Sequence, residues 1–376
     1  MSSEQRKTRV AVVFGGRSSE HEISCVTAGS VLSAVDHDRY EIVPIGVTKG
    51  GHWVLAPSDP ERLRIDPRTR ALPSVPEDGA GLALSFDGAG QLLRVAPGGR
   101  AERLPRVDAV LPLLHGPFGE DGTIQGLFEM MGVRYAGAGV FSSAAAMDKV
   151  FMKAMLSGNA IPTSDYVAVT DRQWRTERER KKALDDIRAL GHTVFVKPAR
   201  AGSSVGISKV SDTSDPDAVS AAVEAAREHD PKVLVEAQVV GREIECGVLE
   251  SEDGGVPDVS LPAEVHVADG FDFYDFEAKY LSTSSLTIPA GIPEEAAARL
   301  RAMAADVFEA MGCEGLARVD FFYTADGEIL VNELNTMPGF TPSSAFPQMW
   351  EATGVGYAAL VERMLATALR RSPGLR

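Results

Sequence analysis

The sequence predicts a multidomain α/β protein with a parallel sheet near the N-terminus and a mixed sheet near the C-terminus, and three observations support this fold class. The chain has 376 residues, too many for one hydrophobic core, so we expect two or three domains. Residues 9–47 follow the order strand, glycine-rich turn, helix, strand, which is typical of a parallel βαβ unit. Residues 319–334 form two strand-like runs around Asp326-Gly327, which predicts an antiparallel hairpin.

The N-terminal βαβ unit has strands at 9–14 and 41–47, with a helix between them that starts near a capping-box pair, Ser19 and Glu22. A dinucleotide-binding Rossmann domain is the obvious alternative. It is disfavoured because the turn lacks G-x-G-x-x-G and no acid ends the second strand. Glu20 lies at the helix N-terminus, where its carboxylate either binds a substrate ammonium group or only complements the helix dipole.

The next segment, 57–105, is rich in proline, glycine and arginine, and it predicts a peripheral elaboration with a weak hairpin at 82–96. A buried strand at 107–114 then leads into the motif HGPFGEDGTIQG and a helix at 123–131. His115 therefore follows the carboxyl end of a strand, at the ligand edge of the sheet. Structural and functional roles are equally expected for it there.

Two lysines and a glycine–serine loop predict a phosphate site in the middle of the chain. A single helix is expected at 141–156, carrying Lys149, and a strand at 193–198 carries Lys197. The loop 202–206 follows that strand, and its backbone amides could cradle phosphate groups beside a lysine. It is not a Walker loop, because no G-K-[ST] and no helix follow; a plain flexible turn is the alternative.

The aromatic and polar stretch at about 271–290 has little regular period and predicts a lid over a site. The remaining elements alternate along the chain, with strands at 165–170, 232–237, 241–249 and 261–267, and helices at 176–190, 214–229, 293–311 and 354–369.

Oxygen ligands converge on the hairpin at 319–334. Glu333 and Asn335 are two residues apart, so they share one face of their strand. Asp320 on the other strand can pair with this region, and Arg318 is close by. Hard oxygens of this kind bind Mg²⁺ together with nucleotide phosphates. The alternative is a solvated hairpin edge, which the abrupt strand break at 335–339 disfavours.

The composition disfavours several classes of partner and cellular location. The net charge is −15 without a lysine–arginine block, which disfavours nucleic acid and anionic membranes. The three cysteines are far apart and lack metal-site spacing, as expected for reduced thiols in the cytosol. No signal-peptide core or membrane-spanning apolar run is present in the sequence.

Seven strings occur in the order of one family: FGGRSSEHEIS, HGPFGEDGTIQG, MDK, VKPARAGSSVG, FYDFEAKYLS, ARVDFF and NELNTMPGFT. With them the chain resembles the ATP-grasp D-alanine–D-alanine ligases over nearly its whole length, apart from 57–105. The resemblance implies an ATP-grasp fold with three domains. These are an N-terminal Rossmann-like α/β domain at 1–139, a small central domain at 140–236, and a C-terminal mixed-sheet domain at 237–376, with ATP between the last two.

The resemblance also implies the reaction. ATP phosphorylates the carboxylate of one D-alanine, and the amine of a second D-alanine attacks the acyl phosphate. The products are D-alanyl-D-alanine for peptidoglycan precursors, ADP and phosphate. ATP would be a co-substrate with two Mg²⁺ or Mn²⁺ ions, and the protein would be a cytoplasmic homodimer.

By resemblance, each candidate residue has an expected role. The catalytic residues are Glu20, Ser203, Tyr280 and Arg318. The substrate-binding residues are Glu20, His115, Lys279, Arg318, Gly339 and Ser344. The ATP-binding residues are Lys149, Lys197, Ser203, Ser204, Glu236, Val239, Glu243 and Asn332. The metal ligands are Asp320, Glu333 and Asn335.

Tyr280 favours an amide product, because relatives that make the D-alanine–D-lactate ester typically depart from tyrosine at this lid position. The alternatives are a D-alanine–D-lactate ligase, another ATP-grasp carboxylate–amine ligase, and a nucleotide-binding regulatory protein without catalysis. The complete set of metal ligands, the two lysines and Arg318 disfavour the last.

Overall fold

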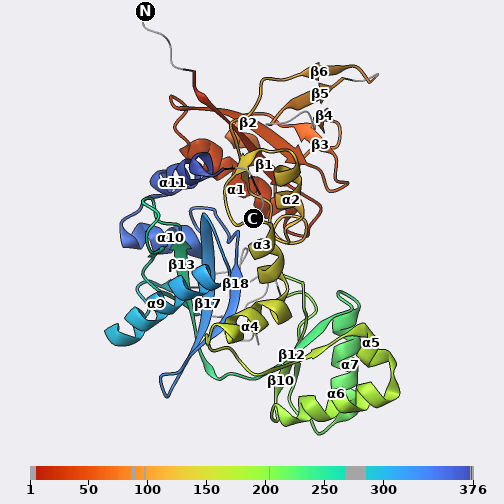
Figure 1. Cartoon of the computed structure of the whole chain (residues 1–376). Coiled ribbons are helices and arrows are strands. Elements are labelled where there is room, and N and C mark those ends of the chain that lie inside the picture. The colour runs from red at the N-terminus through yellow and green to blue at the C-terminus, as the bar shows by residue number, and fades with distance from the viewer. Residues whose placement is uncertain are drawn as a thin grey trace, which may run out of the picture.

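The computed structural model describes residues 6–85, 90–96, 99–202, 204–266, 285–372 and 374, and its strands form three sheets (Figure 1). We refer to them as the N-terminal sheet (β1–β8), the central sheet (β9–β12) and the C-terminal sheet (β13–β18). Ser203, Lys279, Tyr280 and most of the predicted lid lie outside the described residues. The last part of that predicted lid is a short strand, β16, instead.

The N-terminal sheet has eight strands in the order β6-β5-β4-β3-β2-β1-β7-β8. Its strands β2, β1, β7 and β8 run parallel to one another, which confirms the predicted βαβ unit. The segment after β2 adds antiparallel strands, including the weak hairpin as β4 and β5. The strand bounds are β1 Thr8–Gly15, β2 Tyr40–Val47, β3 Trp53–Leu55, β4 Ala80–Leu84, β5 Leu92–Val95, β6 Ala101–Arg103, β7 Ala109–Pro112 and β8 Arg134–Tyr135.

The predicted capping box at the start of helix α1 (His21–Ala34) is wrong. The N-cap residue is Glu20, and no side chain caps the helix. Glu22 forms an ion pair with Lys49 instead. The preceding Ser18 hydroxyl accepts the amide hydrogen of Glu20 at 3.2 Å and donates to the carbonyl of His115 at 2.8 Å. A contact with the next strand end therefore shapes this turn, which local spacing could not reveal.

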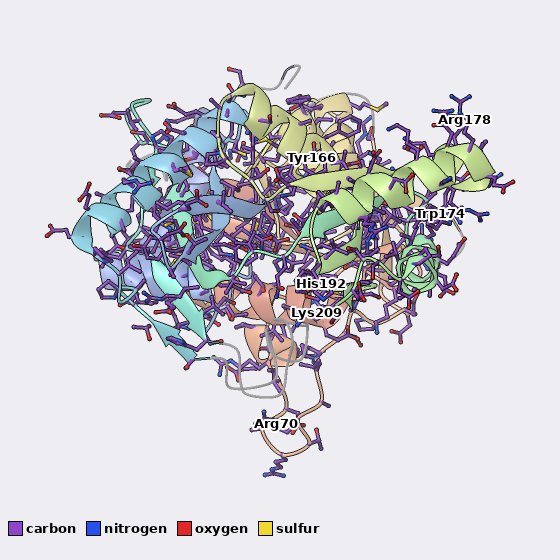
Figure 2. All side chains as sticks on the ribbon, turned by 90° about the horizontal axis from the view of Figure 1, so that it is seen from below. Arg70, Tyr166, Trp174, Arg178, His192 and Lys209 are labelled. Atoms are coloured by element: carbon purple, nitrogen blue, oxygen red, sulfur yellow. The ribbon has the colours of Figure 1, made fainter. Side chains whose placement is uncertain are left out.

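Part of the peripheral segment 57–105 contacts the turn between β1 and α1. After the short helix η1 (Pro60–Leu63), the chain runs through a loop around Arg70 that projects from the body of the molecule (Figure 2). It returns at Val75, whose amide donates to His21 Nε2 at 3.1 Å, while His21 Nδ1 bonds the Gly16 carbonyl at 2.7 Å. This segment thus stabilises the turn between β1 and α1 through His21.

The central sheet has the order β11-β10-β12-β9 and packs against helices α6 and α7. Its strands are β9 Tyr166–Val169, β10 Val194–Pro198, β11 Ser208–Val210 and β12 Val233–Ala237. Its helices are α5 Asp171–Arg175, α6 Glu177–Ala189 and α7 Pro216–Arg227. The short α5, which was not expected, starts at a complete capping box formed by Thr170 and Gln173.

The single helix expected at 141–156 is two helices, α3 (Val140–Met147) and α4 (Lys149–Gly158). Asp148 lies between them in an extended conformation and accepts the amides of Val150 and Phe151 at 3.2 and 3.3 Å. It also pairs with Lys232, which precedes β12. This aspartate therefore ends one helix, caps the next and places Lys149 at a helix start.

The C-terminal sheet has the order β16-β15-β13-β17-β18, with β14 beside β13. Helices α4 and α9 (Glu294–Ala310) pack on this sheet. Helix α11 (Tyr357–Arg370) shares a hydrophobic core with β1, β7 and α1, so the N-terminal and C-terminal parts of the chain pack together (Figure 1). The strands are β13 Gly241–Leu249, β14 Asp258–Val259, β15 Ala263–His266, β16 Ser285–Thr287, β17 Leu316–Thr324 and β18 Ile329–Asn335. The other helices are α2 Thr123–Met130, α9 Glu294–Ala310, α10 Ala345–Thr353 and α11 Tyr357–Arg370.

The three cysteines are free and buried, in agreement with the sequence. Within the described ranges, no helix has the length and apolar character needed to cross a membrane.

Candidate active site

A cleft between the central and C-terminal sheets encloses a cavity of about 260 Å³. Its walls come from β10, β12, β13, β17 and β18. The cavity brings together all the described residues that were predicted to bind ATP, and two of the predicted metal ligands. These lining residues are Lys149, Lys197, Ser204, Glu236, Val239, Glu243, Asn332, Asp320 and Glu333.

One wall of this cleft is a buried ion cluster around Glu236. Lys153 Nζ lies 2.7 Å from Glu236 Oε1 and 2.9 Å from the Ser164 hydroxyl, and Lys197 pairs with the other carboxylate oxygen. Burial alone would raise the pKa of Glu236, but Lys197 and Lys153 hold it at about 2. Glu236 is therefore fully ionised, and Lys197 is held at the cavity wall.

Lys153 was missed by the sequence reasoning. It is fully buried, and burial lowers its pKa, although Glu236 opposes that shift. The available signal was its spacing: Lys153 follows Lys149 by four residues on α4, so both lie on one helix face. A second lysine on the face that carries a predicted phosphate ligand could have marked it.

Lys149 lies where the two sheets and the phosphate loop meet. Its Nζ donates to the carbonyl of Ala201 at 3.1 Å and lies 3.5 Å from Glu333 Oε2. The loop is anchored upstream by Arg200, whose guanidinium donates to both Asp230 oxygens at 2.6 and 2.9 Å. Of the described loop residues, Gly202 and Ser204 line the cavity.

The β17–β18 hairpin has the predicted register, with Asp320 opposite Glu333 and Arg318 opposite Asn335. Asn335 Nδ2 donates to Asp320 Oδ2 at 3.1 Å, so these side chains are adjacent. Arg318 donates to both oxygens of Asp320 at 2.6 and 2.7 Å and lies 3.3 Å from Glu245. Burial would lower the pKa of Arg318, but Asp320 and Glu245 raise it well above its usual range.

The donor set of the hairpin fits a hard divalent cation that is shared with phosphate oxygens. It consists of two carboxylates and one amide on adjacent strands. Across the described part of the chain, no group of three His, Cys, Asp or Glu side chains is arranged for a metal ion. Mg²⁺ sites of this kind usually take their remaining ligands from phosphate oxygens and water.

A second, smaller cavity of about 60 Å³ opens beside the first, and both are lined by Lys149, Gly202 and Glu333. It is formed where the N-terminal sheet meets the end of β18. Its other polar walls include Glu20, His115, Glu120, Arg318, Asn335 and Gly339. Glu333 of the hairpin lines both cavities, so a group transferred between their contents would pass beside the hairpin.

Gly116 allows Glu20 to reach this second cavity. Its φ of +68° lies in the left-handed region, and a Cβ there would come within 2.6 Å of Glu20 Oε2. His115 is buried beside it, and its Nδ1 donates to the Met337 carbonyl at 3.1 Å. Burial lowers the pKa of His115, only partly offset by Glu20, so the imidazole is neutral near pH 7.

Glu120 is a second acid in this cavity that the sequence reasoning missed. Burial, followed by the negative charge of Glu20, raises its pKa to about 8. Its oxygens accept the amides of Gly116 at 2.6 Å and Met337 at 3.1 Å. Its place in the motif HGPFGEDG, four residues after that glycine, was the available signal.

The remaining predicted residues lie at different places in the structure. Gly339 lines the second cavity. Ser344 is the N-cap residue of α10 without capping it; its hydroxyl accepts the amide of Thr341 at 3.2 Å, and it lines neither cavity. Ser203, Lys279 and Tyr280 lie outside the described residues, so their predicted roles stay predictions.

Two family profiles cover most of the chain. The profile described as "D-ala D-ala ligase N-terminus" matches residues 9–138, and "D-ala D-ala ligase C-terminus" matches residues 155–366. Among curated proteins, the D-alanine–D-alanine ligase of Kineococcus radiotolerans is 56% identical and covers 100% of both chains. The ligase of the same name from an Arthrobacter species is 52% identical, over 98% of this chain and 96% of its own.

Solved structures give the same result. The VanG D-Ala:D-Ser ligase from Enterococcus faecalis is 33% identical with a TM-score of 0.81, over 96% of this chain and 100% of its own. The D-alanine–D-alanine ligase from Coxiella burnetii is 31% identical with a TM-score of 0.78, over 98% and 95%. The order of motifs, the two adjoining cavities and these full-length matches agree: the chain belongs to the D-alanine–D-alanine ligase family.

Proposed function

We propose that this protein uses ATP to join two D-alanine molecules into D-alanyl-D-alanine for peptidoglycan synthesis. The observation that carries the proposal is the full-length match to curated D-alanine–D-alanine ligases at 48–56% identity. The two adjoining cavities support it, because a nucleotide and a small zwitterion must lie next to each other for phosphoryl transfer.

The chemistry needs a leaving group on a carboxylate. One oxygen of the first D-alanine carboxylate attacks the γ-phosphorus of ATP, the bond to ADP breaks, and an acyl phosphate forms. The amine of the second D-alanine, after losing a proton, attacks the acyl carbon and expels phosphate. Positioning and charge neutralisation provide most of the catalysis in such transfers.

In this proposal ATP occupies the larger cavity. Glu236, Val239 and Glu243 line the part of it expected to bind adenine and ribose, while Lys149 and Lys197 face the phosphates. The loop at 202–206 would cover the triphosphate. Asp320, Glu333 and Asn335 would hold two Mg²⁺ or Mn²⁺ ions. Bound there, the ions would draw charge from the phosphate oxygens.

The first D-alanine would occupy the smaller cavity. Glu20 would bind its ammonium group, with neutral His115 beside it. Arg318 and the amide of Gly339 would stabilise the oxyanion of the tetrahedral intermediate. Arg318 would have to share its guanidinium between Asp320, which it contacts in this structure, and the intermediate.

The second D-alanine would bind through residues outside the cavity walls described above. We propose that Lys279 and Ser344 hold its carboxylate. Ser203 and Tyr280 would link the lid to Glu20 and keep the site dry, because water would hydrolyse the acyl phosphate.

A second candidate differs only in the nucleophile. The match to a D-Ala:D-Ser ligase at 33% identity favours considering D-serine as the second substrate. D-Lactate is the other alternative, through a hydroxyl in place of an amine. The curated relatives of higher identity are named D-alanine–D-alanine ligases, so we favour D-alanine.

Competition separates these products. The protein is given ATP, Mg²⁺ and D-alanine together with an equal concentration of D-serine or D-lactate, across neutral pH, and the products are quantified by mass spectrometry. We expect D-alanyl-D-alanine to dominate in each mixture. A dominant mixed product near pH 7 would replace the substrate assignment, and ATP turnover without any ligated product would contradict ligation.

We further propose that the enzyme acts in the cytoplasm as a homodimer, as is usual in the resembled family. Light scattering during gel filtration tests the oligomeric state. A mass near twice the 40.1 kDa of the chain is expected, and a monomer at the assay concentration would contradict it.

A further inference from the structure

The peptide groups on both sides of Met337 are held by side chains that follow β7 of the N-terminal sheet. Glu120 Oε1 accepts the amide of Met337 at 3.1 Å, and His115 Nδ1 donates to its carbonyl at 3.1 Å. Met337 lies in the C-terminal part of the chain, two residues beyond β18. These bonds therefore join segments more than two hundred residues apart at the wall of the smaller cavity.

Among the residues that the structure describes, the short segment 336–339 pairs with no strand, so these two bonds help to fix its course. Met337 is fixed on both sides, and the ring of Pro338 fixes the next φ near −65°. Only the ψ angle of Pro338 is left to set the direction of the Gly339 amide. Further on, the chain is anchored again, because Phe340 is fully buried and its carbonyl accepts from the Tyr357 hydroxyl at 2.8 Å.

Glu120 is suited to this task by its second bond. Its Oε2 accepts the amide of Gly116 at 2.6 Å, in the turn that brings His115 to Met337. One carboxylate thus accepts the amide of Gly116 from the N-terminal part of the chain and that of Met337 from the C-terminal part. A substrate ammonium bound beside Glu20 favours the ionised form of Glu120, and hydrogen bonds to an ionised acceptor are roughly twice as strong as neutral ones.

We propose that Glu120 is a positioning residue for the ligation reaction, because it holds the turn 337–339 so that the Gly339 amide faces the oxyanion of the tetrahedral intermediate. The inference rests on the proposed function, in which Gly339 donates to that oxyanion. Glu120 acts through Met337, and the reacting atoms do not need to touch it.

Two other roles are distinguishable from this one. If Glu120 binds the substrate ammonium directly beside Glu20, its loss should raise the KM for D-alanine at the first subsite. If it only stabilises the fold, its loss should lower Tm and leave kcat of the folded protein unchanged. The positioning role predicts a loss in kcat with little change in either KM.

Glu120→Gln tests the role with minimal change in shape. Glutamine offers one acceptor oxygen, and its NH₂ group faces the other amide, so one of the two bonds is lost. Glu120→Asp is one methylene shorter and cannot span both amides. The matched control is Glu250→Gln, because Glu250 also accepts a backbone amide, that of Gly315 at 2.8 Å, and lines neither cavity.

We expect kcat of Glu120→Gln to fall roughly 10- to 100-fold, the effect of losing a hydrogen bond to a charged group. The KM for ATP should stay within about twofold. A phosphinate analogue of the intermediate should lose affinity by a similar factor, and Glu250→Gln should behave as wild type. Unchanged kcat in Glu120→Gln, or a loss confined to the KM for D-alanine, would overturn the proposal.

Hydrogen exchange of the ligand-free proteins above pH 8, where Glu120 is ionised, gives a readout that does not depend on turnover. In Glu120→Gln, the amides in 336–339 should exchange faster than in wild type, and those of Glu250→Gln should not change there. Unaltered exchange at 336–339 would overturn the positioning role even if the variant were less active. A wild-type protein that made no dipeptide would instead contradict the proposed function, while the exchange result would still decide whether Glu120 holds this turn.

Discussion

At the scale of single residues, Glu120 and its neighbours make the smaller cavity sensitive to pH. Glu120 faces Glu20, His115 and Arg318; burial and the charge of Glu20 raise its pKa to about 8. The free protein therefore holds a proton on Glu120 at pH 7. An ammonium group bound beside Glu20 favours the ionised form of Glu120. We expect D-alanine binding at pH 7 to release a proton.

Titration calorimetry in two buffers of different ionisation enthalpy measures this release. Identical binding heats in both buffers would contradict the assignment.

The raised pKa of Glu120 also sets how the stability of the folded state changes with pH. A raised carboxyl pKa stabilises the folded state fully below the ordinary value of 4.5, and this contribution is lost as pH rises toward about 8. The Tm of wild type should thus fall across this window relative to Glu120→Gln.

Lys153 carries the second prediction at this scale. It is fully buried, and its removal leaves Glu236 with one of its two lysine partners and the Ser164 hydroxyl. Breaking a buried ion pair on one side typically costs about 3 kcal/mol. We expect Lys153→Met to lower the free energy of unfolding by about this amount in urea and to raise the KM for ATP, because Lys197 must then compensate the charge of Glu236 without Lys153 and is less available to the phosphates.

The control for Lys153 is Lys182→Met. Lys182 pairs with Asp186 on the exposed face of α6, where such pairs contribute little. Its loss should leave both the unfolding curve and the KM for ATP nearly unchanged. If the two lysine variants proved equally stable, the buried cluster would not have the importance assigned to it.

At the scale of elements, Asp148 shows how one side chain divides a helical sequence. The stretch 141–156 has continuous helical propensity, so a single helix was a reasonable prediction. Asp148 accepts two amides of α4 and pairs with Lys232, and these contacts favour an extended conformation at this point. The Lys232 contact spans 84 residues, which is why the local pattern could not reveal the break.

The third prediction therefore concerns a pair of substitutions at Asp148. Asp148→Asn keeps a good N-cap and loses the charge paired with Lys232, whereas Asp148→Ala loses both. The alanine variant should be less stable than the asparagine variant by about 1 kcal/mol, the usual value of an N-cap. Denaturant unfolding measures the difference. Equal stability of the two variants would show that the cap is unimportant.

The β17–β18 hairpin is the element that the sequence predicted best. The position of its turn, its strand pairing and the adjacency of Asp320, Glu333 and Asn335 were inferred correctly. The expected two-residue turn was wrong in length, because the Thr324 amide donates to the Glu328 carbonyl at 3.0 Å and three residues lie between them. The reason is physical: the turn chemistry of Asp326-Gly327 and the two-residue side-chain period are local properties. The capping box of α1 failed for the opposite reason, because Ser18 is bound to His115 across the sheet.

At the scale of the whole molecule, the candidate site combines residues from all three sheets. The fold class and the parallel N-terminal sheet could be predicted because each βαβ signal is local. The contacts of Glu120 with Met337 and of Lys153 with Glu236 could not be, since 217 and 83 residues separate the partners. The role of the peripheral segment, whose Val75 amide donates to His21, could likewise not be inferred from the composition of the segment.

The central claim is that both cavities serve one reaction, in which a D-alanine carboxylate receives the γ-phosphoryl group of ATP and an amine then attacks the acyl carbon and expels phosphate. Only this sequence of steps moves a carboxylate oxygen into the released phosphate. The most direct test supplies D-alanine labelled with ¹⁸O in its carboxylate, together with ATP and Mg²⁺. The phosphate and the dipeptide are then analysed by mass spectrometry.

The account predicts one ¹⁸O atom in the released phosphate for every D-alanyl-D-alanine formed. Unlabelled phosphate released alongside dipeptide would contradict an acyl phosphate intermediate, and labelled phosphate without dipeptide would contradict ligation.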